Sequence, residues 1–237
     1  MQFVIANYKM NGDSAFYKDA QKQLNKLKVK DTKLILCLPF VYIPGVFGKN
    51  NFELGAQNIS TRTNSKSTGQ ISPNMLKEFK VKYAIVGHSE CRALGDTDEQ
   101  IALKVKNAIE NGITPILCVG ESEKNGSLQI IKQQLKSALK FVDANAQLII
   151  AYEPVWAIST GETPTAKQVD SAVKIIHTEL NKLKIIAPIV YGGSINEDNY
   201  TKFLPCNING FLLGGISLNL NKFKKIVLGV EQCKKEF

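Results

Sequence analysis

Three residues with acid–base chemistry lie at or near the ends of short apolar runs, which are typical of buried strands. Glu153 comes directly after the run 148–152, His88 one glycine after the run 83–86, and Lys9 just behind the first apolar run of the chain. A carboxylate that ends an apolar strand costs free energy unless it is paired or has a function. A carboxylate base, an imidazole donor and an ammonium group together favour proton transfer next to a carbonyl group.

Two glycine pairs add a second kind of chemistry. Gly192 and Gly193 precede Ser194, and Gly214 and Gly215 follow a later apolar run. A backbone without side chains lets its N–H groups approach an oxyanion closely. One such pair is more often an ordinary tight turn, but two pairs after successive strands favour a phosphate site. The sequence therefore predicts proton abstraction on a small phosphorylated carbonyl compound.

Metal-assisted chemistry is disfavoured. The only two histidines, His88 and His177, are far apart in the sequence, and no close cluster of carboxylates accompanies either. These residues cannot form the usual ligand set of a zinc or calcium site. We predict no metal ion, and an ordinary helix position for His177.

Short β-rich runs must position these residues. Several of the runs are almost continuously apolar, as in parallel strands that are covered on both faces. Their starts are about 20–40 residues apart, which leaves room for a crossover helix each time. The predicted strands are 3–6, 34–38, 52–56, 83–86, 115–119, 148–152, 186–191 and 210–213.

Helix signals fill the intervals. Thr97 with Gln100, and Thr165 with Gln168, have the spacing of capping boxes, and each pair precedes an apolar stripe at helical spacing. Two further stripes begin at Leu128 and Leu220 and have one apolar face. The stripe positions are 101, 105, 108 and 109; 128, 131, 135 and 139; 169, 173, 176, 180 and 183; and 220, 223, 227 and 230.

Eight strand–helix units predict one α/β domain, a (β/α)8 barrel over residues 1–237. The alternative is a doubly wound open sheet, because the order of the strands cannot be read from the sequence. That alternative is weakened because no G-x-G-x-x-G motif follows the first strand. In a barrel, the residues described above would meet at the C-terminal ends of the strands.

The charge balance allows a second class of function. The chain has 30 basic and 21 acidic residues, for a net charge of +9, and only Arg62 and Arg92 are arginines. Nucleic-acid binders usually concentrate basic residues on one face. The lysines here are dispersed over helix-like segments, which favours a solvated surface without nucleic-acid binding. A polyanion-binding protein remains the alternative.

The cellular setting is indicated by cysteine usage and by apolar length. Five cysteines without C-x-x-C spacing indicate reduced thiols, most of them structural. The apolar runs are far shorter than the roughly 18 residues that a membrane span needs. No basic region followed by a long apolar segment marks a secretory signal. We expect a cytoplasmic protein with no membrane partner.

The strings at the strand ends resemble those of the triosephosphate isomerase family. The resemblance covers nearly the whole chain, in order, and the string AYEPVW is highly specific. It implies a TIM barrel that interconverts dihydroxyacetone phosphate and D-glyceraldehyde 3-phosphate in glycolysis and gluconeogenesis, without a cofactor. The matching strings are NYKMNG (7–12), GHSE (87–90), AYEPVWAI (151–158), YGGS (191–194) and GFLLGG (210–215).

The resemblance also implies a role for each residue. Glu153 would be the base, His88 a neutral imidazole that polarises the substrate oxygens, and Lys9 the group that offsets substrate charge. Supporting roles fall to Ser89 and Glu90 beside this pair, and to Glu121 as the partner of Trp156 in the lid. The implied substrate-binding residues are Asn7, Lys9, Ser159, Ser194, Gly214 and Gly215.

Finally, the resemblance implies a homodimer through the polar segment from Thr61 to Ser72. This segment holds one apolar residue among twelve and would insert into a second subunit. The chain departs from the family where Gln70 and Cys91 stand in place of Glu and Arg. It also departs in the lid, where the family usually has Gly, Lys and Ala at Ser159, Glu162 and Pro164.

Overall fold

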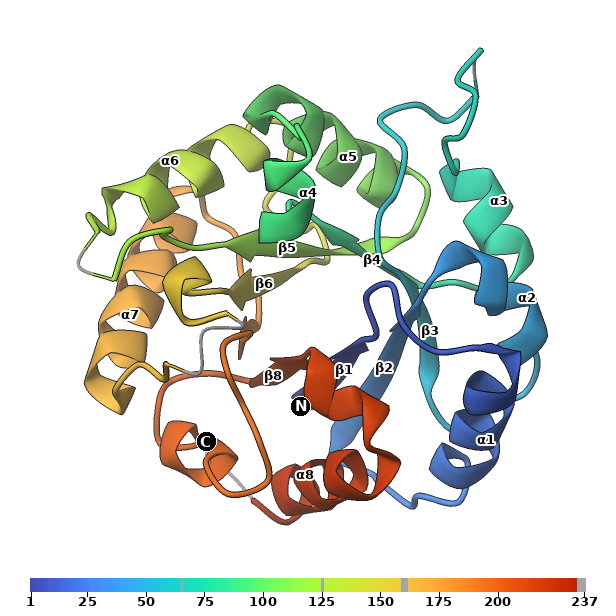
Figure 1. Ribbon diagram of the computed structural model, residues 1–237. Helices are drawn as coiled ribbons and strands as arrows, with labels where there is room; N and C mark the ends of the chain where they lie inside the picture. Colours follow the sequence, from blue (N-terminus) through green and yellow to red (C-terminus); the bar gives the residue numbers. More distant parts are fainter. Residues whose placement is uncertain (65, 125, 159–161, 234–237) are drawn as a thin grey trace.

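Eight parallel strands close into a barrel in the computed structural model, which describes residues 1–64, 66–124, 126–158 and 162–233. Each strand pairs with its neighbours in chain order, and the last strand pairs with the first (Figure 1). The predicted (β/α)8 barrel is confirmed, and the open sheet is excluded. The strands are β1 (Gln2–Asn7), β2 (Thr32–Leu38), β3 (Glu53–Ala56), β4 (Tyr83–Val86), β5 (Thr114–Val119), β6 (Ile149–Tyr152), β7 (Ile189–Tyr191) and β8 (Gly210–Leu213).

Helices surround the barrel on the outside (Figure 1). The α-helices are α1 (Ser14–Leu24), α2 (Ile43–Val46), α3 (Pro73–Glu78), α4 (Ser89–Ala93), α5 (Asp98–Glu110), α6 (Gln129–Ala138), α7 (Ala166–Lys182) and α8 (Leu220–Gln232). The described residues also form short 3-10 helices: η1 (Phe40–Tyr42), η2 (Val155–Ala157), η3 (Tyr200–Phe203) and η4 (Gly215–Leu218). Within the described residues, the segment between β7 and β8 contains η3 and no α-helix.

Both predicted capping boxes form. The Thr97 hydroxyl accepts the backbone N–H of Gln100, whose side chain accepts the N–H of Thr97, and α5 begins there. Thr165 and Gln168 make the same pair of bonds at the start of α7. Each box satisfies N–H groups that the first helical turn leaves without partners. These local signals therefore set where two of the long helices begin.

The apolar side chains form two separate layers. Side chains alternate along each strand, so Ile5 points into the barrel while Val4 and Ala6 face the helices. The barrel interior is filled by residues such as Ile5, Ile35 and Ile116. The second layer lies between strands and helices and includes the predicted helix stripes, except for Leu183, which is exposed. Burial on both faces explains why the strands are almost continuously apolar.

The prediction for the seventh strand was wrong at its start. We predicted residues 186–191, but β7 begins at Ile189, and the side chain of Ile186 is 92% exposed. Pro188 has no N–H to donate to a neighbouring strand. Regular pairing begins only at Ile189, which lies opposite Ile150 of β6. Two of the helix stripes also extend beyond their helices, because Leu128, Leu139 and Leu183 are cap residues.

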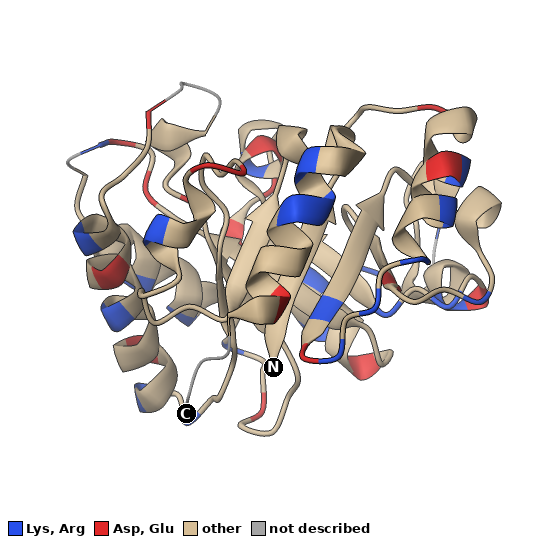
Figure 2. Ribbon diagram, turned by 90° about the horizontal axis from the view of Figure 1, so that it is seen from below, with Lys and Arg blue, Asp and Glu red and all other residues tan. Residues whose placement is uncertain are grey.

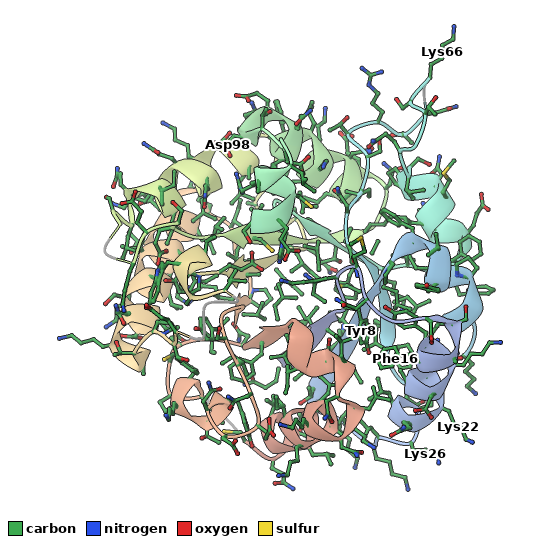
Figure 3. All side chains as sticks on the ribbon, in the orientation of Figure 1. Tyr8, Phe16, Lys22, Lys26, Lys66 and Asp98 are labelled. Atoms are coloured by element: carbon green, nitrogen blue, oxygen red, sulfur yellow. The ribbon has the colours of Figure 1, made fainter. Side chains whose placement is uncertain are left out.

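Charge is spread over the outer surface. Figure 2 shows Lys and Arg on helices and loops around the barrel, with Asp and Glu between them. Lys22 on α1 and Lys26 just after its end point away from the body in Figure 3. All five cysteines are free thiols. Over the ranges that the structure describes, no helix combines the length and the apolar character that crossing a membrane requires.

Candidate active site

A cavity of about 370 Å³ opens at the C-terminal ends of the strands. It brings together side chains from β1, β4 and β6 with backbone from the loops after β7 and β8. Residues from distant parts of the sequence thus meet in one place. The lining residues include Asn7, Lys9, His88, Glu153, Gly192, Gly193, Ser194, Asn196, Asn199, Gly214 and Gly215.

His88 and Glu153 form a close pair inside this cavity. The Nε2 atom of His88 lies 3.3 Å from Oε1 of Glu153, and the two side chains are only 6% and 3% exposed. His88 follows β4 and Glu153 follows β6. A carboxylate and an imidazole that are held together away from water can both act on one small substrate.

The backbone fixes the tautomer of His88. The N–H of Glu90, in the first turn of α4, donates a hydrogen bond to Nδ1 of His88 at 3.1 Å. Because Nδ1 accepts this bond, it has no proton, and the ring proton lies on Nε2. The neutral ring therefore presents an N–H donor toward Glu153 and the cavity.

The environment makes Glu153 a stronger base than an exposed glutamate. Burial raises the pKa of its carboxyl group above the ordinary value of 4.5. His88, the Cys118 thiol, the backbone N–H of Ser89 and the Lys9 ammonium stabilise the charged form and oppose the rise in pKa. The raised pKa shows that burial outweighs these contacts.

Lys9 has an unusual backbone conformation. Its φ angle is +53°, in the left-handed region that non-glycine residues rarely adopt. The Lys9 N–H donates to Oδ1 of Asn7 at 3.1 Å, and its Nζ lies 2.6 Å from Oε1 of Glu90. Asn7 and Glu90 thus hold both ends of Lys9, and the ammonium faces the same cavity as Glu153.

The loops after the neighbouring strands β7 and β8 form another part of the cavity wall. Gly192, Gly193 and Ser194 line it after β7, and Gly214 and Gly215 line it after β8. The Ser194 hydroxyl donates to the carbonyl of Ala157, which links this wall to η2. A Cβ atom on Gly215 would meet no protein atom within 4 Å, so the space beside it is open. The predicted Ser159 lies outside the described residues.

Glu121 connects β5 to the segment after Glu153. Its Oε1 atom accepts hydrogen bonds from Nε1 of Trp156 at 2.9 Å and from the hydroxyl of Tyr152 at 3.0 Å. The Glu121 side chain is buried. The predicted Glu121–Trp156 contact is therefore present, with Tyr152 as a further partner.

Our sequence reading missed several residues of the site. Cys118 is one of the five cysteines that we expected to be mostly structural, yet it hydrogen-bonds to the Glu153 carboxyl group. Gln57 follows β3 directly and contacts the backbone of Lys9; a polar residue at a strand end is the signal that could have found it. Asn196 and Asn199 line the cavity from a loop, where no periodic pattern marks them. His177, as predicted, lies on an outer helix, α7, and contacts Asn207.

Comparison with known proteins identifies the family. The family model described as triosephosphate isomerase matches residues 2–230. The chain is 37% identical to the triosephosphate isomerase of Wolbachia sp. subsp. Brugia malayi, an alignment that covers 97% of this chain and 98% of the relative. It is 41% identical to the enzyme of that name from Hydrogenovibrio crunogenus (93% and 94% covered) and 38% identical to that of Mesomycoplasma hyorhinis (94% and 96%). The chain belongs to the triosephosphate isomerase family.

Proposed function

We propose that this protein interconverts dihydroxyacetone phosphate and D-glyceraldehyde 3-phosphate, a step of glycolysis. The observation that supports this most strongly is the buried His88–Glu153 pair, which lines the same cavity as two glycine-rich loops. Membership of the triosephosphate isomerase family supports the same reaction. Each feature of the cavity matches one requirement of that chemistry.

Glu153 acts as the base. Its carboxylate takes a proton from C1 of dihydroxyacetone phosphate, and the electron pair of that C–H bond moves toward the carbonyl to form an enediolate. The proton on the C1 oxygen then moves to the C2 oxygen, and the same carboxyl group returns a proton to C2, which gives the C1 aldehyde without net gain or loss of atoms. Burial suits this role, because the raised pKa increases the affinity of Glu153 for the proton that it moves.

His88 and Lys9 stabilise the charge that develops on the substrate oxygens. The Nε2–H of neutral His88 donates to these oxygens, and the Lys9 ammonium offsets negative charge from the same cavity. Glu90 supports both residues, since its backbone N–H holds the His88 ring and its carboxylate pairs with Lys9. Glu153, His88 and Lys9 thus act on one substrate in the same cavity.

The glycine loops bind the phosphate. The open space beside Gly215 admits a group that a side chain would exclude. Backbone N–H groups of Ser194, Gly214 and Gly215 supply the donors, and Ser159 contributes another. Phosphate binding holds the reacting carbons at the His88–Glu153 pair.

A coupled assay on the purified protein is the direct test. Dihydroxyacetone phosphate is converted in the presence of a dehydrogenase that consumes glyceraldehyde 3-phosphate, and the reverse direction is measured separately. We expect turnover in both directions. Absence of turnover in a folded sample would refute the proposal. Salt-dependent binding of unrelated nucleic acid without turnover would instead support the polyanion-binding alternative.

The protein works as a cytoplasmic homodimer in this proposal. The segment from Thr61 to Ser72 extends away from the barrel beyond α3, with Lys66 at its far end (Figure 3). In the segments that follow β1, β2 and β4, Met10, Val41 and Leu94 are 97%, 77% and 90% exposed. Large exposed apolar side chains at this end of the barrel support a surface that a partner covers.

Sedimentation velocity at low and high salt tests the dimer. Gln70 and Cys91 are neutral where the family commonly has an ion pair, so no unpaired charge would be buried between subunits. We expect a dimer at micromolar concentration whose stability changes little with salt. A monomer, or steep weakening of the dimer by salt, would contradict this proposal and leave the isomerase proposal intact.

A further inference from the structure

We infer that Gln57 is a positioning residue that holds the backbone of Lys9 in its active conformation. This inference depends on the proposed isomerase function, since it assigns Gln57 a role in that reaction. Gln57 is not among the residues that line the cavity, so it acts through Lys9 and not on the substrate.

The amide group of Gln57 joins three strand ends. Its Nε2 atom donates to the carbonyl oxygen of Lys9 at 2.9 Å and to that of Cys37 at 3.1 Å. Cys37 lies near the end of β2, and its carbonyl oxygen also accepts the N–H of Tyr8 at 3.3 Å. One nitrogen with two hydrogens therefore fixes the chain after β1 against the ends of β2 and β3.

Lys9 needs such a restraint because its backbone conformation is unfavourable. A φ angle of +53° brings the Cβ atom of an L-residue close to its own backbone, and the conformation persists only where surrounding contacts impose it. Asn7 restrains the N–H of Lys9, and Gln57 restrains its carbonyl group. Without Gln57, the carbonyl is free to rotate toward ordinary φ values.

Such a rotation would move the ammonium group. The Lys9 side chain passes beside Gly214, where an added Cβ would lie 3.5 Å from Cε of Lys9, and ends at Glu90. A change in the backbone conformation of Lys9 changes the direction in which its side chain leaves the Cα atom. The Nζ atom then leaves the position from which it offsets substrate charge.

The chemistry of the side chain fits this role closely. A primary amide presents two hydrogens from one nitrogen, as two carbonyl acceptors require. A leucine at this position keeps the approximate volume but donates to neither carbonyl. An ionised glutamate has no hydrogen to donate, so its carboxylate oxygens would repel the carbonyl oxygens of Lys9 and Cys37.

The test compares Gln57→Leu with Gln21→Leu. Gln21 also donates through Nε2 to two acceptors, the carbonyl of Val46 and Oδ1 of Asn50, but it lies on α1 away from Lys9. We expect Gln57→Leu to lower kcat/KM by about 10- to 100-fold, with KM raised and kcat lowered, as for a displaced group. Gln21→Leu should change thermal stability while leaving kcat/KM within about twofold of wild type.

A double-mutant cycle with Lys9→Met separates positioning from a general structural effect. If Gln57 acts through the ammonium group, Gln57→Leu changes kcat/KM by less than about twofold once that group is absent. The residual rate is measured at raised protein concentration. Full additivity of the two losses would overturn the inference, as would an unchanged kcat/KM in Gln57→Leu.

Gln57→Glu is the second variant if Gln57→Leu does not fold. We expect its kcat/KM to fall as well, and to fall less at acidic pH, where the carboxyl group regains one hydrogen. Wild-type kcat/KM at all pH values would overturn the inference. An inactive wild-type protein would instead refute the proposed function, so the two failures are distinguishable.

Discussion

The two walls of the cavity differ in the groups that they present to a substrate. On the side of β4 and β6, the cavity is lined by buried titratable side chains, and His88 and Glu153 are each less than a tenth exposed. On the side of β7 and β8, the lining includes Gly192, Gly193, Gly214 and Gly215, and a Cβ atom on Gly215 would meet no protein atom within 4 Å. Proton transfer needs titratable groups whose pKa values are set by their surroundings. Phosphate binding needs backbone N–H groups close to the phosphate and enough space to admit it.

The electrostatics differ in the same way. On the side-chain wall, burial raises the pKa of Glu153, and the N–H of Glu90 leaves the His88 ring with its proton on Nε2. Such tuning depends on the surroundings of each group. On the glycine wall, the donors are backbone dipoles whose strength does not depend on pH. Substitutions on the two walls should therefore have different effects on the kinetic constants.

The largest effect is expected from Glu153→Gln. We expect kcat to fall by about 10³–10⁴-fold, the upper part of the range for a positioned base, because the amide cannot accept the substrate proton. Steady-state kinetics measure this loss. Glu53→Gln, which removes a carboxylate paired with Lys82 at the other end of the barrel, is the control and should keep wild-type kcat. If Glu153→Gln retained a tenth of the wild-type rate, another group would have to be the base.

His88→Gln should have the next largest effect. The amide can still donate a hydrogen bond to the substrate oxygen, so we expect a loss of about 10²-fold in kcat, smaller than for Glu153→Gln. The pH dependence of kcat/KM at acidic pH should still report the Glu153 carboxyl group. Wild-type kcat after this substitution would exclude the electrophilic role of His88.

Gly215→Ala tests the glycine wall without touching the side-chain wall. The new methyl group would meet no protein atom within 4 Å and would occupy the proposed phosphate site, at an expected cost of about 1–3 kcal/mol or roughly 5- to 150-fold in kcat/KM. We expect an unchanged melting temperature. Gly193→Ala is the contrasting variant, since its methyl group would collide with the buried Tyr191 hydroxyl and should lower the melting temperature. Equal kcat/KM for Gly215→Ala and wild type would contradict the phosphate site.

The smallest expected effect is that of Glu153→Gln on the stability of the folded protein. Burial raises the pKa of Glu153 in the folded protein, so the folded state binds this proton more tightly than the unfolded state does. The free energy of unfolding therefore falls as the pH rises from the ordinary pKa through the raised one. We expect Glu153→Gln to have a higher melting temperature than wild type at pH 7–8, with the difference shrinking below about pH 4.5. A lower melting temperature for the variant at neutral pH would show that the charged carboxylate is stabilised.

Local patterns in the sequence determined most of the fold. Capping boxes at Thr97 and Thr165 predicted where α5 and α7 begin, because a cap involves residues only three positions apart. Apolar runs predicted the strands, since burial on both faces leaves no polar positions. The start of β7 could not be predicted in this way. It depends on where Ile150 of the neighbouring strand offers a partner, and not on the apolar character of Ile186.

The same division holds for the site. The position of Glu153 behind an apolar strand and the two glycine pairs were visible in the sequence, because a strand end and a missing side chain are local facts. The tautomer of His88, the raised pKa of Glu153 and the contact of Gln57 with Lys9 were not. Each depends on which groups lie within a few ångströms across different strands, and those distances exist only once the barrel has closed.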